Sequence, residues 1–269
     1  MTAASRDQAL VAVRDWLNAT SGIFYPDRKF DLFGQRMDRV LRKCGLADYA
    51  ELARRLADED IAVQRAATDA ASTNHTSFFR EPQVLDRFRE TLLPDLMRHE
   101  RIRIWSAACS TGDEAYTLGI IAAEAMGLDA AQARLAILGT DVSGPVVKQA
   151  EAAVYGQNHL QTVPEALLAR YFQPVGMQQY RLAEPLRRIC TFRRMNLKSL
   201  PYPFRNRFHA VFCRNILYYF DRETQRFILD ALHEVTEPGG WLVTSVTESV
   251  RDLGTRWEPV ATGIYRRPE

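Results

Sequence analysis

From residue 100 onward, short apolar runs of β-type residues alternate with helical segments, and this pattern constrains the fold more than any other. The expected strands are IRIWSAA (102–108), LAILGTDV (135–142), FHAVFCRN (208–215), WLVTSVT (241–247) and GIYRR (263–267). Helical segments lie between them, among them SGPVVKQAEAAVYG (143–156) and TQRFILDALHEVTEPGG (224–240). Such alternation predicts an α/β fold with a parallel, doubly wound sheet. A ligand of this fold is expected at the carboxyl ends of the strands.

Residues 5–70 have a different pattern. Apolar residues recur at three- and four-residue spacing in ALVAVRDWL, FDLFGQRMDRVLRKCG, YAELARRL and IAVQRAATDAAS, which predicts a set of short helices. We expect Gly45 to end one helix and Asp48 to cap the next. The stretch 160–207 breaks the later alternation, because QYRL and RRICTF with turn residues between them favour a small antiparallel insert.

Composition and charge argue against several classes of protein. The 269 residues carry a formal net charge of +2, which does not indicate a general nucleic-acid binder. The N-terminus does not read as a signal peptide, and no run approaches the roughly 18 apolar residues of a membrane span. The cysteines form no CxxC pair, and the histidines lack metal-ligand spacing. These observations predict a cytoplasmic protein with reduced thiols and no metal.

The loop after the first expected strand is a candidate binding element. It reads AACSTGDE (107–114) and continues into a helix. It matches neither GxGxxG nor a P-loop. Asp113 and Glu114 would repel a pyrophosphate but suit a cationic ligand, such as the amino group or sulfonium of S-adenosylmethionine. The alternative is an ordinary small-residue turn whose acids favour the helix N-terminus.

Asp141 ends the second expected strand, downstream of that loop. A carboxylate at this place in an α/β fold commonly accepts hydrogen bonds from ribose hydroxyls. It would also serve as the N-cap of the helix that starts near Ser143. The loop and the acid in this order favour an adenosyl ligand more than either does alone.

Two further segments combine polar and aromatic side chains. TNHTSFFRE (73–81) joins the two halves of the chain, and its Arg80 offers a planar fork for a carboxylate. A surface pair of Arg80 and Glu81 beside a buried phenylalanine would also explain this segment. RNILYYF (214–220) follows the third expected strand and would face the site, although its tyrosines could instead be aromatic core.

Together, these segments resemble a known family. TNHTSFFRE, WSAACSTGDEAYT, GTDVS, MNL (195–197) and FCRNILYYFD, in this order and spacing, are similar to the chemoreceptor glutamate methyltransferases, the CheR family. The resemblance covers nearly the whole chain. It implies an N-terminal all-α helical domain (1–72), a Rossmann-like S-adenosylmethionine-dependent methyltransferase domain (73–269) and, within it, a small antiparallel β-subdomain insert (160–195).

The resemblance also implies roles for individual residues. The catalytic arginine and tyrosine proposed for the family fall on Arg80 and Tyr219, and the RNxxxY spacing selects Tyr219 over Tyr218. The cofactor contacts of the family fall on Asn74, Thr76, Arg80, Glu114, Asp141, Asn196, Leu197, Arg214 and Asn215. The cofactor would be S-adenosyl-L-methionine, its product S-adenosyl-L-homocysteine, and the reaction would form glutamate methyl esters on chemoreceptors for adaptation in chemotaxis.

Two departures from the family pattern are visible. Members often read GHSE near the C-terminal strand, where this chain reads SVTE (245–248). The loop of the insert around PVG (174–176) is short, so we expect that a C-terminal receptor pentapeptide is not needed as a tether.

Basic residues gather in two places. Lys29, Arg36, Arg39 and Lys43 could line one stripe of a helix, and the cation-rich stretch 170–207 includes Arg187 and Arg188. Because methyl-accepting receptor helices are acidic, we expect both surfaces to bind the cytoplasmic helical region of chemoreceptors. A solvated helix face is the alternative for the N-terminal stripe. We expect a monomer, with no nucleic-acid partner and no direct membrane insertion.

The proposed chemistry needs few catalytic groups. A glutamate side chain has a pKa of about 4.3 and is ionised at neutral pH, so methyl transfer to it needs no general base. Two alternatives stay open at this point. One is a methyltransferase for RNA or a small molecule, whose basic insert would track phosphates. The other is a non-catalytic module that binds S-adenosylmethionine or S-adenosylhomocysteine.

Overall fold

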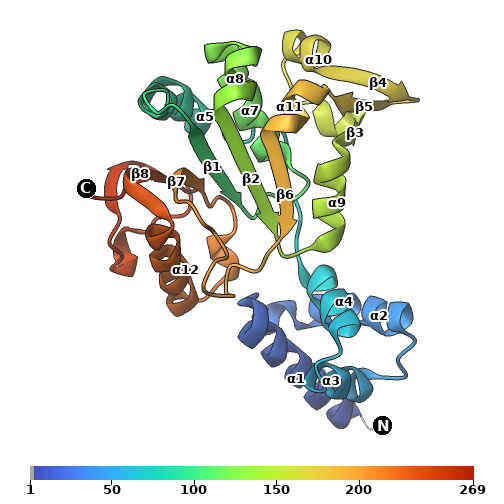
Figure 1. Cartoon of the computed structure of the whole chain (residues 1–269). Coiled ribbons are helices and arrows are strands. Elements are labelled where there is room, and N and C mark those ends of the chain that lie inside the picture. Colours follow the sequence, from blue (N-terminus) through green and yellow to red (C-terminus); the bar gives the residue numbers. More distant parts are fainter. Residues whose placement is uncertain (1–2) are drawn as a thin grey trace.

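The computed structural model describes residues 3–269, so residues 1–2 of the expected helical domain lie outside the described residues. Helices come first along the chain: α1 (Ala3–Ser21), α2 (Phe30–Cys44), α3 (Tyr49–Ala57) and α4 (Ile61–Ala71), with a 3-10 turn (Asp27–Lys29) before α2. Buried side chains such as Leu17, Phe33 and Leu52 form a separate core among them. In Figure 1 these helices lie at one end of the molecule, next to the tips of the strand arrows.

Two sequence signals set helix boundaries in this part of the chain. Gly45 follows α2 with a φ of 65°, and its N–H donates to the carbonyl of Leu41. Glycine adopts this left-handed conformation without a steric penalty. Asp48 is the N-cap of α3, and its side chain accepts a hydrogen bond of 2.9 Å from the N–H of Glu51. Both predictions are confirmed.

A seven-stranded sheet forms the centre of the remaining chain, in the order β6-β2-β1-β7-β8-β10-β9. The parallel strands are β1 (Ile102–Ala107), β2 (Leu135–Asp141), β6 (Cys190–Arg194), β7 (Phe208–Phe212) and β8 (Thr236–Val243). Of the last two strands, β10 (Ile264–Arg266) is antiparallel to β8, and β9 (Glu258–Ala261) is antiparallel to β10. The predicted α/β fold is confirmed. Because the strand order reverses at β1, the fold places a ligand at the carboxyl end of β1.

Helices cover both faces of this sheet (Figure 1). They are α5 (Pro82–Arg87), α6 (Leu93–Leu96), α7 (Asp113–Met126), α8 (Leu128–Arg134), α9 (Gly144–Ala152), α11 (Glu184–Ile189) and α12 (Arg222–Glu234), whereas α10 (Glu165–Tyr171) packs beside a second, small sheet. Side chains alternate along each strand, so Ile104 belongs to the core on the α7 side and Trp105 to the core on the α12 side. None of the helices in the described part of the chain is long and apolar enough to cross a membrane.

The expected helix over 224–240 is too long. Helix α12 ends at Glu234, and Thr236 already pairs with Phe208 of β7. The register shifts in this part of β8, and a Cβ on Gly240 would lie 3.0 Å from the carbonyl oxygen of His209. The Pro-Gly-Gly sequence therefore lies in an irregular stretch of strand and does not end a helix. The expected helix over 143–156 is also too long, because its last residues form β3 (Val154–Gly156).

A second, antiparallel sheet has the strand order β3-β5-β4, with β4 at Phe172–Gly176 and β5 at Gln179–Leu182. A small antiparallel sheet is thus present, but its bounds differ from 160–195. It begins at Val154, and β6 is instead parallel to β2 in the large sheet. Cys190 and Phe192 of β6 are buried in the main core, which accounts for this pairing. The division into domains at residues 72 and 73 stays a prediction.

His209 joins β7 to β1 near the amino ends of the two strands. Its Nδ1 accepts a hydrogen bond of 3.0 Å from the N–H of Arg103, and the ring of His99 lies 4.2 Å away. Burial, and the nearby Arg103 cation, lower the pKa of His209 to about 4. An unfolded histidine has a pKa of about 6.5, so the unfolded state binds more protons between these two values and stability falls as the pH falls through this window.

We expect His209→Asn to flatten this dependence, because asparagine keeps an acceptor for Arg103 and does not titrate. Urea unfolding of both proteins at pH 7.0 and 4.5 measures the effect. The wild type should lose roughly 1–3 kcal/mol more than the variant over this interval. Parallel losses in the two proteins would show that His209 is not the titrating group.

Candidate functional site

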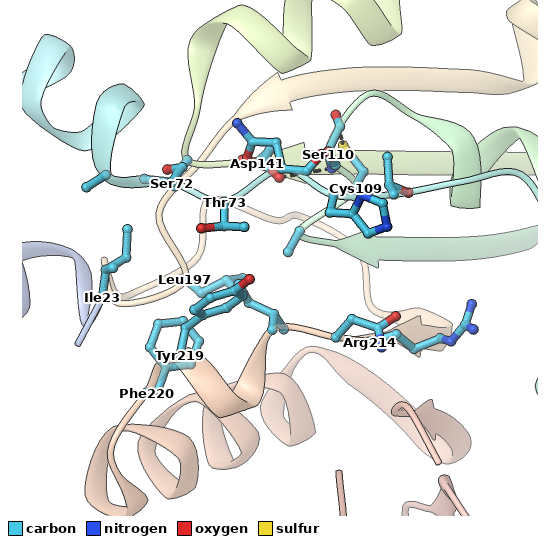
Figure 2. Close-up of a pocket in the computed structure, with 18 of the residues that line it drawn as sticks. Ile23, Ser72, Thr73, Cys109, Ser110, Asp141, Leu197, Arg214, Tyr219 and Phe220 are labelled. Atoms are coloured by element: carbon cyan, nitrogen blue, oxygen red, sulfur yellow. Dashed lines mark hydrogen bonds between the residues drawn. The ribbon is translucent and has the colours of Figure 1, made fainter. Parts of the chain in front are cut away.

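A pocket opens at the carboxyl ends of β1, β2 and β7, where the fold places a ligand. Its lining comes from Ala108–Ser110 after β1, Asp141 at the end of β2, and Arg214–Ile216 after β7. Residues of the N-terminal helical part, such as Ile23 and Leu32, line the same pocket. In Figure 2, Asp141 and Ser110 lie on one side of the pocket, and Tyr219 and Phe220 lie on the other.

The pocket brings together the residues that the family resemblance selects. Its lining includes all of the expected cofactor contacts: Asn74, Thr76, Arg80, Glu114, Asp141, Asn196, Leu197, Arg214 and Asn215. Tyr219 also lines the pocket, whereas the side chain of Tyr218 is not part of the lining and is 54% exposed. The core residues of this segment are Leu217 and Phe220, so neither tyrosine is aromatic core. The geometry favours Tyr219 over Tyr218, and the individual roles stay predictions.

Arg214 and Glu114 form a buried ion pair at the back of the pocket. Arg214 Nη1 donates to Glu114 Oε2 at 2.9 Å, and only 3% of the arginine side chain is exposed. Glu114 Oε1 accepts a second hydrogen bond from Ser106 Oγ at 2.7 Å. Glu114 is therefore paired with Arg214 and is not an isolated charge, but it remains in the pocket lining, and its role toward a cationic ligand stays a prediction. Arg214 Nε, in contrast, is buried without a partner in the described chain, which leaves a donor for an acceptor on a bound ligand.

Asp113 does not face the pocket either. Its fully buried carboxylate accepts a hydrogen bond from Thr111 Oγ1 at 2.6 Å and contacts His159 Nε2. The contact with Asp113 raises the pKa of His159 above its ordinary value. This pair joins the start of α7 to the 3-10 turn Gln157–Leu160, next to the small sheet. The cation-binding role expected for Asp113 is corrected to a structural contact.

Arg80 and Glu81 point to different partners. Arg80 Nη1 donates to the carbonyl of His75 at 3.0 Å, while Glu81 accepts from Asn215 Nδ2 at 2.8 Å. The surface-pair interpretation of this segment is therefore wrong. Phe79 and Glu81 both have positive φ values, 52° and 56°, which turn the chain on each side of Arg80.

Strained backbone is concentrated around this pocket. Besides Phe79 and Glu81, the residues Ala108, Ser110 and Asn215 have φ values of 78°, 48° and 57°. Non-glycine residues rarely adopt positive φ, and such strain persists where surrounding contacts enforce it. Its concentration at the three loops of the pocket supports a binding role for them.

Asp141 links the loop after β1 to the start of α9. Its carboxylate accepts 2.9 Å hydrogen bonds from the N–H groups of Ser110 and Ser143. Ser143 is the N-cap residue of α9, so the interpretation of Asp141 as that N-cap is wrong. Burial raises the pKa of Asp141 above its ordinary value. Each carboxylate oxygen retains a lone pair that can accept a hydrogen bond from a ligand hydroxyl.

The N-terminal helical part is hydrogen-bonded to the rest of the site. The N–H of Phe24 donates to the carbonyl of Tyr219 at 2.9 Å. Lys198 Nζ donates to the carbonyls of Asn18 and Ala19, and Asn196 Nδ2 donates to that of Thr20. These carbonyls lie in the last turn of α1, where helix carbonyls commonly need partners from outside the helix, and that of Asn18 also accepts from the N–H of Gly22 at 2.8 Å. The side-chain N–H₂ group of Asn196 is thus used to hold α1.

The expected basic surfaces lie in different surroundings. Lys29, Arg39 and Lys43 are exposed, and Lys29 lies at the edge of the pocket. Arg36 turns inward, where its guanidinium donates to Tyr25 Oη at 2.6 Å and to Thr73 Oγ1 at 3.1 Å. It therefore binds residues 71–73, which line the pocket together with Arg36 itself, and it does not belong to the exposed stripe.

Arg187 and Arg188 lie on α11, outside the pocket lining. Figure 1 shows α11 beyond the end of β6 that is farther from α2. Arg188 pairs with Glu184 one turn away, with 3.0 Å between Arg188 Nε and Glu184 Oε1.

The sequence did not single out two buried or half-buried carboxylates beside the pocket, Glu81 and Glu248. Glu248 accepts hydrogen bonds from the N–H groups of Asn215 and Leu217 at 2.7 and 2.8 Å. Glu81 ends the TNHTSFFRE segment, and Glu248 ends the SVTE segment at which the family often reads GHSE, and these were the available signals. Within residues 3–269, no group of three or more His, Cys, Asp or Glu side chains is arranged to hold a metal.

Removing the Arg214 cation should be costly, because Glu114 and Glu81 would lose their common partner in a buried place. We expect Arg214→Gln to lower the free energy of unfolding by on the order of 3 kcal/mol, measured by urea titration. Arg188→Gln is the matched control, since it removes an exposed arginine–glutamate pair and should change stability little. Equal effects of the two substitutions would contradict the importance of the buried pair.

The model of the CheR methyltransferase family, described as its SAM binding domain, matches residues 74–265. Chemotaxis protein methyltransferase 1 of Pseudomonas aeruginosa is 32% identical to the chain and covers 99% of each sequence. The chemotaxis protein methyltransferase of Salmonella typhimurium is 33% identical over 87% of this chain and 81% of its own length. The chemotaxis protein methyltransferase of Escherichia coli is 30% identical over 91% of this chain and 85% of its own length. The chain therefore belongs to the CheR family of S-adenosylmethionine-dependent methyltransferases.

Proposed function

We propose that this chain transfers a methyl group from S-adenosylmethionine to glutamate side-chain carboxylates of chemoreceptors, forming glutamate methyl esters. The names of the relatives specify chemotaxis and methyl transfer, and the proposal adds the glutamate carboxylate as the acceptor group. The observation that carries it is that Arg80 and Tyr219 line one pocket together with the candidate cofactor residues. An arginine and a phenol beside a cofactor suit a carboxylate acceptor.

The hydrogen-bond donors and acceptors of the pocket fit the cofactor. Asp141 offers acceptors for ribose hydroxyls, and the unpartnered Nε of Arg214 offers a buried donor for a carboxylate or another acceptor. The small residues Ala108 and Ser110 let the backbone approach a ligand closely. When bound, S-adenosylmethionine supplies an activated methyl group. No metal is part of the proposed reaction.

In this proposal, Arg80 and Tyr219 orient the acceptor. The acceptor carboxylate is ionised at neutral pH, so positioning it in line with the methyl group is the main task. Within residues 3–269, the guanidinium of Arg80 makes one hydrogen bond, from Nη1 to the carbonyl of His75, and its other N–H groups remain available. A tight arginine–carboxylate pair would stabilise the ground state, so the hydroxyl of Tyr219 supplies the weaker and more selective contact. Ile23, Leu197 and Phe220 form apolar parts of the wall that exclude water.

The proposed partner is the acidic cytoplasmic helical region of a chemoreceptor, which places the reaction in the cytoplasm. The exposed cations Lys29, Arg39 and Lys43 belong to the N-terminal helical part, whose residues also form one wall of the pocket. They would attract an acidic helix toward the pocket. Arg187 and Arg188 would meet a different part of the receptor. The chain acts as a monomer in this proposal, without nucleic acid or membrane insertion.

The test is transfer of labelled methyl groups to membranes that contain candidate chemoreceptors, followed by mild base. Carboxyl methyl esters hydrolyse in base, whereas N-methyl groups do not. We expect base-labile receptor label, with Arg80→Ala and Tyr219→Phe lowering the rate roughly tenfold to a hundredfold through lost orientation. Tyr218→Phe is the matched control and should lower the rate much less than Tyr219→Phe, because Tyr218 is not part of the pocket lining and phenylalanine keeps the ring contact of 4.4 Å with Tyr219.

Three outcomes would contradict the proposal. Base-stable label on RNA or a small molecule would identify a different acceptor. Cofactor binding without label on any receptor would support a non-catalytic module. Loss of activity in Tyr218→Phe, but not in Tyr219→Phe, would reverse the assignment of the tyrosine.

A further inference from the structure

The turn after β7 carries three candidate site residues, Arg214, Asn215 and Tyr219, but little regular structure of its own. Its only helical part in the described chain is the 3-10 turn Leu217–Tyr219. Asn215 has a φ of 57°, a left-handed conformation that residues with a side chain adopt less readily than glycine. Contacts from outside the turn must therefore hold it in place.

Glu248 provides these contacts. Its side chain lies behind the turn, is not part of the pocket lining, and the residue is 6% exposed. Oε2 accepts hydrogen bonds from the N–H groups of Asn215 at 2.7 Å and Ser245 at 3.2 Å, and Oε1 accepts one from Leu217 at 2.8 Å. Two of the three donors belong to the turn. The backbone of Glu248 is itself fixed, because its carbonyl accepts from Thr244 Oγ1 at 2.8 Å.

Glu81 fixes the side chain of the same asparagine. Its Oε1 accepts from Asn215 Nδ2 at 2.8 Å and from Ser245 Oγ at 2.9 Å. Burial acts to raise the pKa of Glu81, but the Asn215 amide and the Arg214 cation outweigh it and lower the pKa below its ordinary value. Glu81 is therefore ionised and can only accept hydrogen bonds. Asn215 must direct its NH₂ group to Glu81, which leaves Oδ1 for a ligand in the pocket.

We infer that Glu248 is a positioning residue of the cofactor site, whose carboxylate fixes the Arg214–Tyr219 turn so that Asn215 and Tyr219 lie on the pocket wall. The inference rests on the proposed cofactor position in this pocket. Glu248 acts through the turn and does not touch the ligand.

The number of donors explains why a carboxylate is required. Three N–H groups converge on two oxygen atoms, and a glutamine would offer one oxygen and one NH₂ group. In either orientation of that amide, at least one buried backbone N–H of the turn or of Ser245 would lose its acceptor. A lost acceptor of this kind commonly changes local geometry and destabilises the conformation that depends on it.

The experiment is calorimetric titration of the full chain with S-adenosylhomocysteine, together with thermal unfolding of each protein. We expect Glu248→Gln to weaken binding about tenfold or more while the protein remains folded. Asp60→Asn is the matched control, because Asp60 also holds backbone N–H groups, those of Ala62 and Val63 at the start of α4. Asp60 is not part of the pocket lining, so its loss should lower Tm without changing the dissociation constant.

A double-mutant cycle separates positioning from a general structural role. If Glu248 acts through Asn215, Glu248→Gln should weaken binding much less in an Asn215→Ala background, by about threefold or less. Glu248→Asp keeps the charge but has a shorter reach, so it should give an intermediate loss. This variant carries the same test if the glutamine variant does not fold.

The unfavourable outcomes are distinct from one another. Unchanged binding in both Glu248 variants, or losses that add fully with Asn215→Ala, would overturn the inference and leave the proposed function intact. Absence of S-adenosylhomocysteine binding by the wild type would overturn the proposed cofactor pocket, and the inference with it.

Discussion

The buried guanidinium of Arg214 is the contact on which the site depends most. It joins the end of β7 to Glu114 at the start of α7, and its Nη2 donates to the carbonyl of Arg80 at 2.8 Å. Three segments far apart in the sequence are thereby held at the carboxyl edge of the sheet. A buried cation is stable only when its partners are in place, so this pair also favours one arrangement of the three loops. The strained residues Phe79 and Asn215 are found in the segments that it joins.

The N-terminal helical part completes the pocket from the opposite side. Its last α1 carbonyls accept hydrogen bonds from Lys198 and Asn196, and Phe24 is bound to the carbonyl of Tyr219. The candidate catalytic tyrosine is therefore in direct contact with the segment that leads to α2. This arrangement explains how exposed cations beside α2 could present an acidic substrate to a pocket built mainly by the sheet. The same helices contribute both to the proposed recognition of substrate and to the shape of the site.

Much of the sheet could be predicted from the sequence. Apolar runs such as residues 102–108 indicate buried strands, and the alternation of these runs with helices indicates parallel pairing. The errors occur where tertiary contacts override local signals. Pro238-Gly239-Gly240 has the composition of a helix stop, but pairing with β7 makes it part of an irregular strand. The pocket residues were found through family motifs. The partners of Glu114 and Asp113 could not be predicted, because Arg214 and His159 come from distant segments of the chain. Glu81 and Glu248 escaped detection for the same reason.

The measurement that tests this account most directly is a crystal structure of the chain with bound S-adenosylhomocysteine. The account predicts the ligand at the carboxyl ends of β1 and β2, with ribose hydroxyls hydrogen-bonded to Asp141 and with Arg80 and Tyr219 facing the sulfur. The acceptor side of the sulfur should open toward the N-terminal helices. A ligand bound elsewhere on the chain, or one whose sulfur faces Tyr218 and not Tyr219, would contradict the account.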